Sequence, residues 1–200
     1  AKPNKIAISA DGNGALLALS SSSDITYSRT NVVNASTNGE LSIENSATLK
    51  AGNSVVLDAT KSAKNSGVVS LQDGGSATLG ANNIVIGNAP TVAQGLALNT
   101  GVIAALGQLK SLALNSYNNI DTFGGINFGN DKLNLSMNAA SITGHLATGE
   151  TAASVPANAA PSIITADPFT LKNTTGVKPI IAVANAGRAL TINANNLRLD

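Results

Sequence analysis

The chain reads TLGANNIVIG over residues 78–87, and TINANNLRLD over residues 191–200 repeats this stretch without a gap. A looser copy, TLKAGNSVVLD, occupies residues 48–58 and is one residue longer. Each copy joins two short apolar segments through a small polar corner. A supersecondary unit that recurs along a chain is typical of repeat proteins, in which each unit buries its apolar face against the next copy. The sequence therefore predicts a structural rod, against which any catalytic role has to be weighed.

The composition suits a core made of thin stacked layers. Aromatic residues are 2% of the chain and Trp is absent, so Ala, Val, Ile and Leu must fill the interior. Small and β-branched side chains fit layers that are one strand spacing thick, roughly 4.8 Å. Charged residues are 12% and the net charge is +1, which gives no basic surface for a nucleic-acid partner. The absence of Cys excludes disulfides, thiolate zinc sites and cysteine nucleophiles.

Alternation of apolar and polar residues predicts many short strands with one face inward. Two sets of three strands are expected to correspond to each other. They are Leu41–Ile43, Ala47–Leu49 and Val55–Leu57, followed by Val69–Leu71, Ala77–Leu79 and Ile84–Ile86. The second set trails the first by 28–30 positions, so we expect three strands per coil and parallel pairing between successive coils. A further strand is predicted over Val177–Val183.

The polar corners are rich in Asn and Gly, which tolerate left-handed backbone conformations. Asn82, Asn83, Asn195 and Asn196 are candidates for hydrogen bonding to the equivalent corner one coil away. The alternative is that these residues are only good turn formers.

Two segments interrupt the strand pattern. Asn99–Lys110 carries apolar residues on one helical face after a possible cap at Thr100, so we expect a short helix there. Ser141–Lys178 is rich in Ala, Thr and Pro, and because Pro cannot donate to a strand ladder we expect a long loop excursion from the coil. A passive loop and a binding loop both fit that segment.

At the level of motifs, the chain resembles the filamentous-haemagglutinin-like exoproteins of Gram-negative bacteria. The resemblance rests on the Leu-x-Leu strands, on Leu112–Ser116 followed by Ile120, Asp121 and Gly124, and on the phrases at Phe169–Gly176 and Ala189–Ala194. It implies an all-β fold, a right-handed parallel β-helix, with the chain as a single segment of a longer repeat protein over residues 1–200. The amino-terminal secretion domain of that family and a toxin-like carboxyl end are not recognisable in the sequence.

The resemblance also implies a location and partners. Such proteins are exported by two-partner secretion through an outer-membrane β-barrel and act as adhesins at the cell surface, or carry a toxin tip. We therefore expect a shaft segment of a secreted or cell-surface virulence adhesin that presents a distal binding or toxin region. The sequence leaves open whether the receptor is on a host cell, on another bacterial cell or is a glycan, and whether the protein takes part in biofilm adhesion. It also leaves open that the β-helix itself is a receptor-binding module.

A β-helix enzyme acting on polysaccharides is the third alternative, and the residues give it little support. The eleven acidic residues are scattered, with only Glu40 and Glu44 close together on either side of a strand, whereas glycoside hydrolysis needs two carboxyl groups about 5–10 Å apart. His145 is the only histidine and is expected to be a solvated loop residue.

Two short motifs and one aromatic group complete the candidate residues. Asp11–Gly14 and Gly129–Asp131 resemble fragments of calcium loops but are ordinary turn sequences. Tyr117, Phe123 and Phe128 could form a sugar-stacking platform, although we expect them to fill the coil near the helix. We expect no catalytic, cofactor-binding or metal-binding residues and no cofactor.

Overall fold

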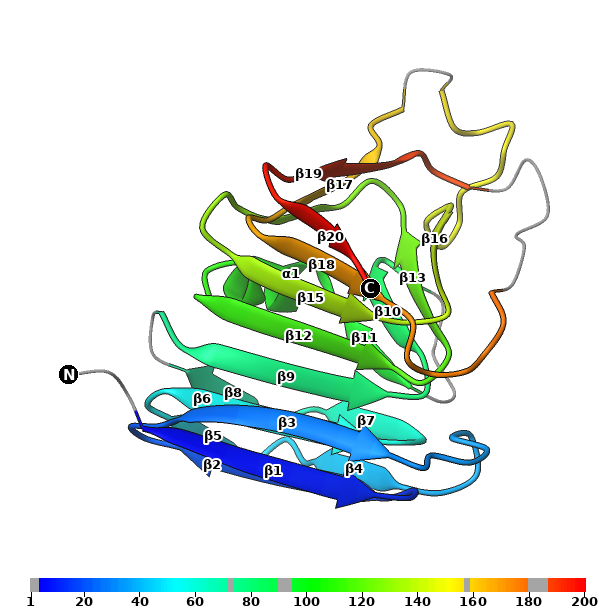
Figure 1. Ribbon diagram of the computed structural model, residues 1–200. Helices are drawn as coiled ribbons and strands as arrows, with labels where there is room; N and C mark the ends of the chain where they lie inside the picture. Colours follow the sequence, from blue (N-terminus) through cyan, green and yellow to red (C-terminus); the bar gives the residue numbers. More distant parts are fainter. Residues whose placement is uncertain (1–3, 72–73, 90–94, 157–158, 180–186) are drawn as a thin grey trace.

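The structure is a computed structural model that describes residues 4–71, 74–89, 95–156, 159–179 and 187–200. Nearly all of its regular structure is β-strand, and strands from successive parts of the chain lie beside one another in layers (Figure 1). The all-β class predicted from the alternating sequence is confirmed.

The longest sheet, which we call sheet 1, faces the viewer in Figure 1. Its seven strands are, in order, β2 (Ala15–Ser20), β6 (Ser54–Ala59), β9 (Ser76–Ala81), β12 (Ser111–Ser116), β15 (Asn134–Asn138), β18 (Phe169–Lys172) and β20 (Leu197–Leu199). All neighbours pair in parallel except β2, which runs antiparallel to β6. At roughly 4.8 Å per strand, the sheet extends about 30 Å in the stacking direction.

Two further sides complete the strand arrangement. The second side contains β4 (Glu40–Ile43), β7 (Ser62–Asn65), β10 (Ile84–Gly87), β11 (Leu96–Leu98), β13 (Asn119–Phe123) and β16 (Ser141–His145). The third side contains β5 (Thr48–Ala51), β8 (Val68–Leu71), β14 (Asn127–Gly129), β17 (Ser162–Thr165) and β19 (Leu190–Asn193). From β6 onward the chain passes from sheet 1 to the second side and then to the third side before it returns to sheet 1. We call one such passage a circuit. Between β9 and β12 the described residues form β11 and α1 instead of a third-side strand, and between β18 and β20 the described residues form only the third-side strand β19.

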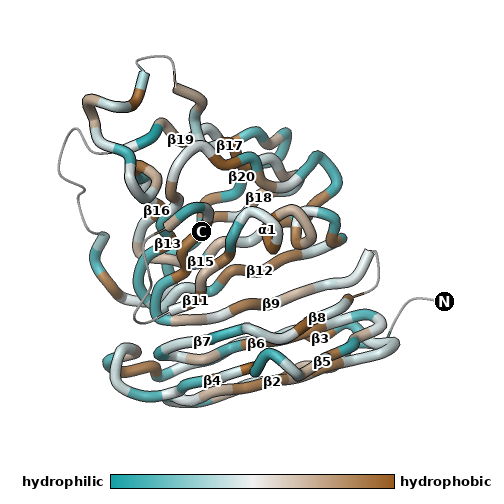
Figure 2. The backbone as a smooth tube through the Cα atoms, turned by 180° about the vertical axis from the view of Figure 1, so that it is seen from behind, coloured by the Kyte–Doolittle hydropathy of each residue, from teal (hydrophilic) through white to brown (hydrophobic). Residues whose placement is uncertain are grey.

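Inward side chains line up in columns across sheet 1. One column follows the register through Leu57, Leu79, Leu114, Met137, Leu171 and Leu199. Leu114 and Met137, in the middle of this column, are 0% exposed. Because successive residues of a strand point to opposite faces, Ala113 and Ser136 lie on the outer face of the same strands. Figure 2 shows the resulting recurrence of apolar positions on stacked strands. Each circuit therefore buries its apolar residues against its neighbours.

The register between circuits differs from the sequence-based prediction. Leu41 of β4 pairs with Ala63 of β7, Leu49 of β5 with Val69 of β8, and Leu57 of β6 with Leu79 of β9, so these circuits are offset by 20–22 residues and not by 28–30. The prediction was wrong because β7 has only one apolar inward residue and was not recognised as a strand. Without β7, each of the three strands of the second set was matched to a strand on the wrong side.

Insertions make other circuits longer. The circuit from β9 to β12 contains the extra strand β11, which lies beside β10, and the helix α1 (Thr100–Leu106). The predicted helix is confirmed, but its cap is Asn99 and not Thr100, because the Asn99 side chain accepts a hydrogen bond from the Val102 backbone N–H at 3.1 Å. Ile103 of α1 is 3% exposed and belongs to the core.

The three copies of the repeated stretch do not occupy one equivalent place. Residues 48–58 and 191–200 each lead from the third side into sheet 1, through β5–β6 and β19–β20. Residues 78–87 lead from sheet 1 into the second side, through β9–β10. The stretch therefore specifies a strand–corner–strand unit that works at two different corners.

A two-stranded ribbon lies outside sheet 1 near the N-terminus. It consists of β1 (Lys5–Asp11) and β3 (Asp24–Thr30), which pair in parallel. β2 lies between them in the sequence and joins sheet 1, so the chain alternates between the two layers. In Figure 1 the ribbon lies in front of β2 and β6.

The expected excursion over Ser141–Lys178 is shorter than predicted. β16, β17 and β18 all lie within that range and belong to the three sides. Among the described residues, the irregular parts of this range and of the chain that follows it are 146–156, 159–161 and 173–179, which contain Pro156, Pro161 and Pro179. The strand predicted over Val177–Val183 is not formed at residues 177–179, and residues 180–183 lie outside the described range.

Candidate functional site

The outer face of β6 is covered by the ribbon, which is unusual for sheet 1. All six residues of β6 are buried, whereas the outward residues of β12 and β15 are partly exposed. Val56 and Asp58 point outward from β6 toward the ribbon, and both are 0% exposed. A carboxylate without solvent needs hydrogen-bond partners and a compensating charge, and the ribbon supplies them.

Three side chains converge on the Asp58 carboxylate. Tyr27 Oη donates to Asp58 Oδ2 at 2.5 Å, and Arg29 Nε donates to the same oxygen at 2.7 Å. Tyr117, which follows β12, donates from its hydroxyl to Asp58 Oδ1 at 2.7 Å. The Arg29 side chain is 5% exposed, so the Arg29–Asp58 ion pair is buried. We call these four residues the Asp58 cluster.

Gly80 makes room for this cluster. It is the register neighbour of Asp58 on β9, and a Cβ atom at Gly80 would lie 1.8 Å from Asp58 Oδ1. A side chain at position 80 would therefore displace the carboxylate. Gly80 of the repeated stretch thus has a packing role in this copy. The sequence alone indicates only a corner-forming role for the Gly residues of these stretches.

The cluster fixes the protonation of its members. Burial raises the pKa of both tyrosines, and the hydrogen bonds and charge of Asp58 raise it further. For Arg29, burial favours the neutral form, but the hydrogen bond and charge of Asp58 outweigh it and raise the pKa. Tyr27 and Tyr117 therefore stay neutral donors and Arg29 stays a cation. The tyrosine hydroxyls and the Asp58 carboxylate use their hydrogen bonds on each other, so the cluster connects the ribbon to sheet 1.

A polar groove adjoins the cluster on the side away from β1. Its volume is about 810 Å³, and it lies between the ribbon with its following loop and the loop after β18. Its wall includes Asn31, Tyr117, Asn118, Asn138 and Lys172. The described residues that line it include Ser, Thr and Asn side chains together with Arg29 and Lys172, and none of them is Asp or Glu.

Part of the predicted asparagine stacking is confirmed. Asn118 Nδ2 donates to Asn83 Oδ1 at 3.0 Å, which joins equivalent corners of two adjacent circuits. Asn195 and Asn196 instead donate to Asp167 of the preceding circuit, at 3.0 and 2.9 Å. Asn82 is 9% exposed, and only its backbone carbonyl takes part in a corner hydrogen bond, from Ser116. Corner residues therefore connect circuits through amides at one corner and through a carboxylate at another.

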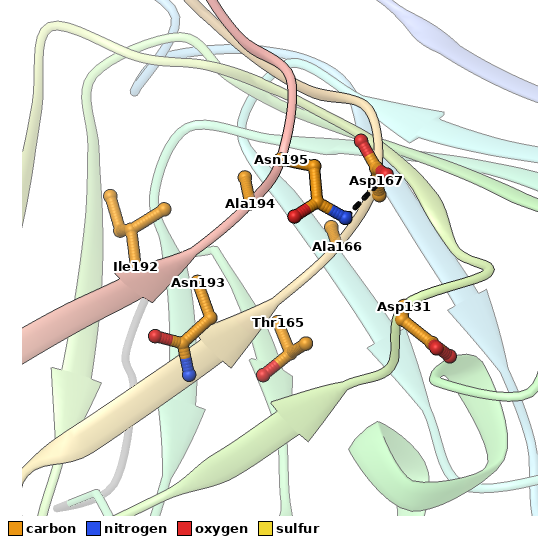
Figure 3. Close-up of a pocket in the computed structure, with 8 residues that line it drawn as sticks. All are labelled: Asp131, Thr165, Ala166, Asp167, Ile192, Asn193, Ala194 and Asn195. Atoms are coloured by element: carbon orange, nitrogen blue, oxygen red, sulfur yellow. Dashed lines mark hydrogen bonds between the residues drawn. The ribbon is translucent and has the colours of Figure 1, made fainter.

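A second, smaller pocket of about 400 Å³ lies at the Asp167 corner (Figure 3). Asp131 and Asp167 both line it, which makes it the place to examine for a pair of catalytic carboxylates. Figure 3 shows the Asn195 amide turned toward Asp167. Hydrogen bonds from Asn196 and Asn195 lower the pKa of Asp167, so this carboxyl is held ionised and its oxygens are engaged. Asp167 therefore accepts hydrogen bonds from the corner of the next circuit, and its pKa is not raised as that of a general acid would be.

His145 does not lie in a loop, as was expected, but in β16. Its Nε2 lies 2.9 Å from Asp121 Oδ1 on the neighbouring strand β13, and its ring stacks on Phe123 with centroids 4.7 Å apart. Parallel pairing places Phe123 and His145 side by side, which sequence reasoning missed because β13 and β16 were not predicted. Among the described residues, no group of three His, Cys, Asp or Glu side chains gathers in a way that could hold a metal ion.

The aromatic residues do not form one group. Phe128 is 1% exposed and fills the core on β14, beside α1, as expected. Tyr117 binds Asp58 outside sheet 1, and Phe123 stacks on His145 on the second side. The expectation that all three fill the coil is therefore wrong for Tyr117 and Phe123, and a common stacking platform is not formed.

The remaining candidate residues have structural partners. The turn at Asp11–Gly14 is tied down because Asp11 Oδ1 accepts from Asn31 Nδ2 at 2.7 Å. In the turn at Gly129–Asp131, Asn130 Nδ2 donates to the Gly107 carbonyl at 2.5 Å. Glu40 is the first residue of β4 and Glu44 follows its last residue, and Glu40 forms an ion pair with Lys61 at 2.6 Å.

The Asp58 cluster could not be read from the sequence as a site, although two weak signals exist. Tyr27 and Arg29 alternate on β3 and so share a face. Asp58 ends the otherwise apolar run Val55-Val56-Leu57. What was missing is the ribbon, which brings Tyr27 and Arg29 into contact with Asp58, from which they are 31 and 29 positions away in the sequence.

Comparison with known proteins gives no match: no family model, no curated protein and no solved structure is similar to this chain. Within the described ranges, no helix combines the length and the apolar character that crossing a bilayer requires.

Proposed function

We propose that the chain is a right-handed parallel β-helix that serves as a shaft segment of a secreted or cell-surface bacterial adhesin. In this proposal it is exported through an outer-membrane β-barrel partner and lies on the outer surface of a Gram-negative bacterium. Its task is to hold a distal binding or toxin region away from the cell.

The single observation that carries the proposal is the apolar columns, which stay open at both ends of the stack. Leu17 and Leu19 continue two columns on β2 and are 39% and 40% exposed. Leu197 and Leu199 continue the same columns on β20 and are 54% and 70% exposed. Phe169, one strand before Leu197, is 0% exposed. In the middle of the stack each column is buried by the neighbouring circuits, whereas at the two ends of the stack the same columns are exposed and could pack against a further circuit.

The parallel ladder supports the mechanical part of the proposal. Backbone hydrogen bonds run from circuit to circuit along three sides, so a load along the stack is shared by many bonds. The secretion route and the adhesin role rest on the resemblance of Leu112–Ser116 and Phe169–Gly176 to haemagglutinin-like exoproteins.

The proposal assigns no catalysis to the chain. Asp58, Asp121 and Asp167 are each engaged by neighbouring side chains that stabilise the stacking or the ribbon. A polysaccharide-cleaving activity would need a carboxyl pair whose oxygens are free to act on the substrate, whereas both oxygens of Asp167 accept hydrogen bonds from Asn195 and Asn196.

The proposal is tested by locating the protein on cells. Antibodies raised against the purified chain should label intact, unpermeabilised bacteria that produce it, and labelling should disappear when the gene of the β-barrel partner is deleted. A cytoplasmic protein of the same cells is the control, since it must stay unlabelled until lysis. Labelling that appears only after lysis would contradict the proposal.

A further inference from the structure

The polar groove between the ribbon and the loop after β18 has the features of a binding site that the shaft function does not use. We propose that it binds a short acidic saccharide, with Lys172 contacting a sugar carboxylate and the amides of the groove contacting hydroxyls. The proposal does not depend on the shaft function, because it rests only on the chemistry of the groove.

The shape of the groove suits an oligosaccharide of a few units. Its volume of about 810 Å³ falls within the range of about 300–1,000 Å³ that is typical of small-molecule sites. It crosses several circuits, because Asn118, Asn138 and Lys172 follow or end the three successive strands β12, β15 and β18. Asn138 and Lys172 are direct register neighbours. Polar groups therefore recur along the groove at the strand spacing, as hydroxyl groups recur along a linear saccharide.

The groove is chemically matched to sugar hydroxyls. A hydroxyl donates one hydrogen bond and accepts others, and an amide side chain offers both functions. The Asn118 amide is held by its hydrogen bond from Nδ2 to Asn83, which leaves Asn118 Oδ1 without a donor among the described residues. Asn138 is likewise fixed by Thr174, whose backbone N–H donates to Asn138 Oδ1 at 2.9 Å. Fixed amides lose little conformational freedom when a ligand binds.

The charge of the groove selects an anion. Its two basic residues differ, because Arg29 is neutralised by the buried Asp58. Lys172 Nζ forms no ion pair with any residue in the described part of the chain. None of the described residues that line the groove is an Asp or Glu that would repel a carboxylate. A uronic-acid unit combines the carboxylate that Lys172 would bind with the hydroxyls that the amides would bind.

Binding is measured by isothermal titration calorimetry of the purified chain. Tetragalacturonic acid is the acidic probe and cellotetraose is the neutral probe. We expect saturable binding of the acidic probe that weakens as salt is added, and at least tenfold weaker binding of the neutral probe. Lys172→Gln should weaken binding of the acidic probe about tenfold, because one charge-assisted hydrogen bond is lost. Ser36→Trp, which fills the groove from its exposed rim, should abolish binding.

Lys132→Gln is the matched control, since Lys132 is an exposed lysine that does not line the groove, and it should bind like the unaltered chain. Circular dichroism checks that each variant is folded. The proposal is overturned if the acidic probe shows no saturable binding, or if cellotetraose binds equally well. It is also overturned if Lys172→Gln and Ser36→Trp bind as the unaltered chain does, since the saccharide would then occupy another surface. None of these results would bear on surface location, so failure here and failure of the shaft proposal can be told apart.

Discussion

The same substitution made at two points of one apolar column should have very different effects on stability. Leu114 lies in the middle of the column on β12 and is 0% exposed, whereas Leu199 lies at its end on β20 and is 70% exposed. Both residues are Leu on strands of sheet 1 and both point inward. Leu114→Ala and Leu199→Ala therefore compare the same substitution at a buried position and at an exposed position of the same column.

The expected magnitudes follow from burial. A fully buried Leu→Ala change removes the transfer free energy and leaves a cavity, which costs about 2–5 kcal/mol of the free energy of unfolding. Full burial of a Leu side chain is worth about 1.5–3 kcal/mol, and Leu199 has less than a third of its surface buried. Leu199→Ala should therefore cost less than about 1 kcal/mol.

The assay is urea unfolding followed by far-ultraviolet circular dichroism, with the free energy taken from the midpoint and the slope. Ala113→Ser, on the outer face of the same strand as Leu114, is the control and should change stability by no more than about 0.5 kcal/mol. Equal losses for the two Leu variants, or a loss below about 1 kcal/mol for Leu114→Ala, would refute the claim that neighbouring circuits bury this column.

Three further predictions concern charged and ionisable groups. Asp58→Asn should lower the free energy of unfolding by about 3–5 kcal/mol because it leaves the buried Arg29 guanidinium without its counter-charge. Glu40→Gln, at an exposed pair with Lys61, should lower it far less, and similar losses for the two variants in urea unfolding would contradict a buried cluster. Tyr27 and Tyr117 are the only tyrosines, so in the folded protein tyrosinate absorbance should stay absent through the ordinary pKa near 10. Their raised pKa stabilises the fold fully below pH about 10, and this stabilisation is lost as the pH rises further, so titration of both tyrosines near pH 10 without unfolding would be incompatible with the cluster. The lowered pKa of Asp167 has the opposite effect: it stabilises the fold above the ordinary carboxyl pKa near 4, and this stabilisation is lost as the pH falls through the lower pKa of the folded state. Asp167→Asn should therefore make the free energy of unfolding fall less steeply with decreasing pH in the acid range. An unchanged pH dependence in that range would contradict the role of Asp167 at the corner.

Much of the strand content could be predicted because the inward face of sheet 1 is apolar at nearly every position. Leu112 and Leu114 alternate with small residues, and each is fully buried in the structure. The short strands with few apolar residues escaped detection, as β7 shows: only Ala63 there is an apolar inward residue, and its neighbour Lys64 is exposed. Periodicity alone could not recover the register once such a strand was missed.

The candidate site was less accessible to sequence reasoning. Asp58, Arg29 and Tyr117 are not neighbours in any repeat. Arg29 meets Asp58 only because β1 and β3 leave the stack and lie over β6, whereas Tyr117 reaches Asp58 from the end of β12. The groove depends on the same ribbon, since its wall includes the loop that follows β3. A repeat pattern predicts what each circuit has in common, whereas the site arises from a segment that departs from the pattern.

The stacking of circuits in parallel register is tested most directly by pairs of cysteines on the outer face of sheet 1, since the chain has no Cys of its own. Ala113 is the register partner of Ser136, and Ser136 is the partner of Thr170. Dibromobimane, which becomes fluorescent when it bridges two close thiols, should therefore label Ala113→Cys/Ser136→Cys and Ser136→Cys/Thr170→Cys in the monomeric protein. It should form no bridge, and therefore stay non-fluorescent, in Ala113→Cys/Thr170→Cys, whose positions are two strand spacings apart. Failure of both neighbouring pairs to bridge, or equal bridging of all three pairs, would contradict the stacked parallel arrangement.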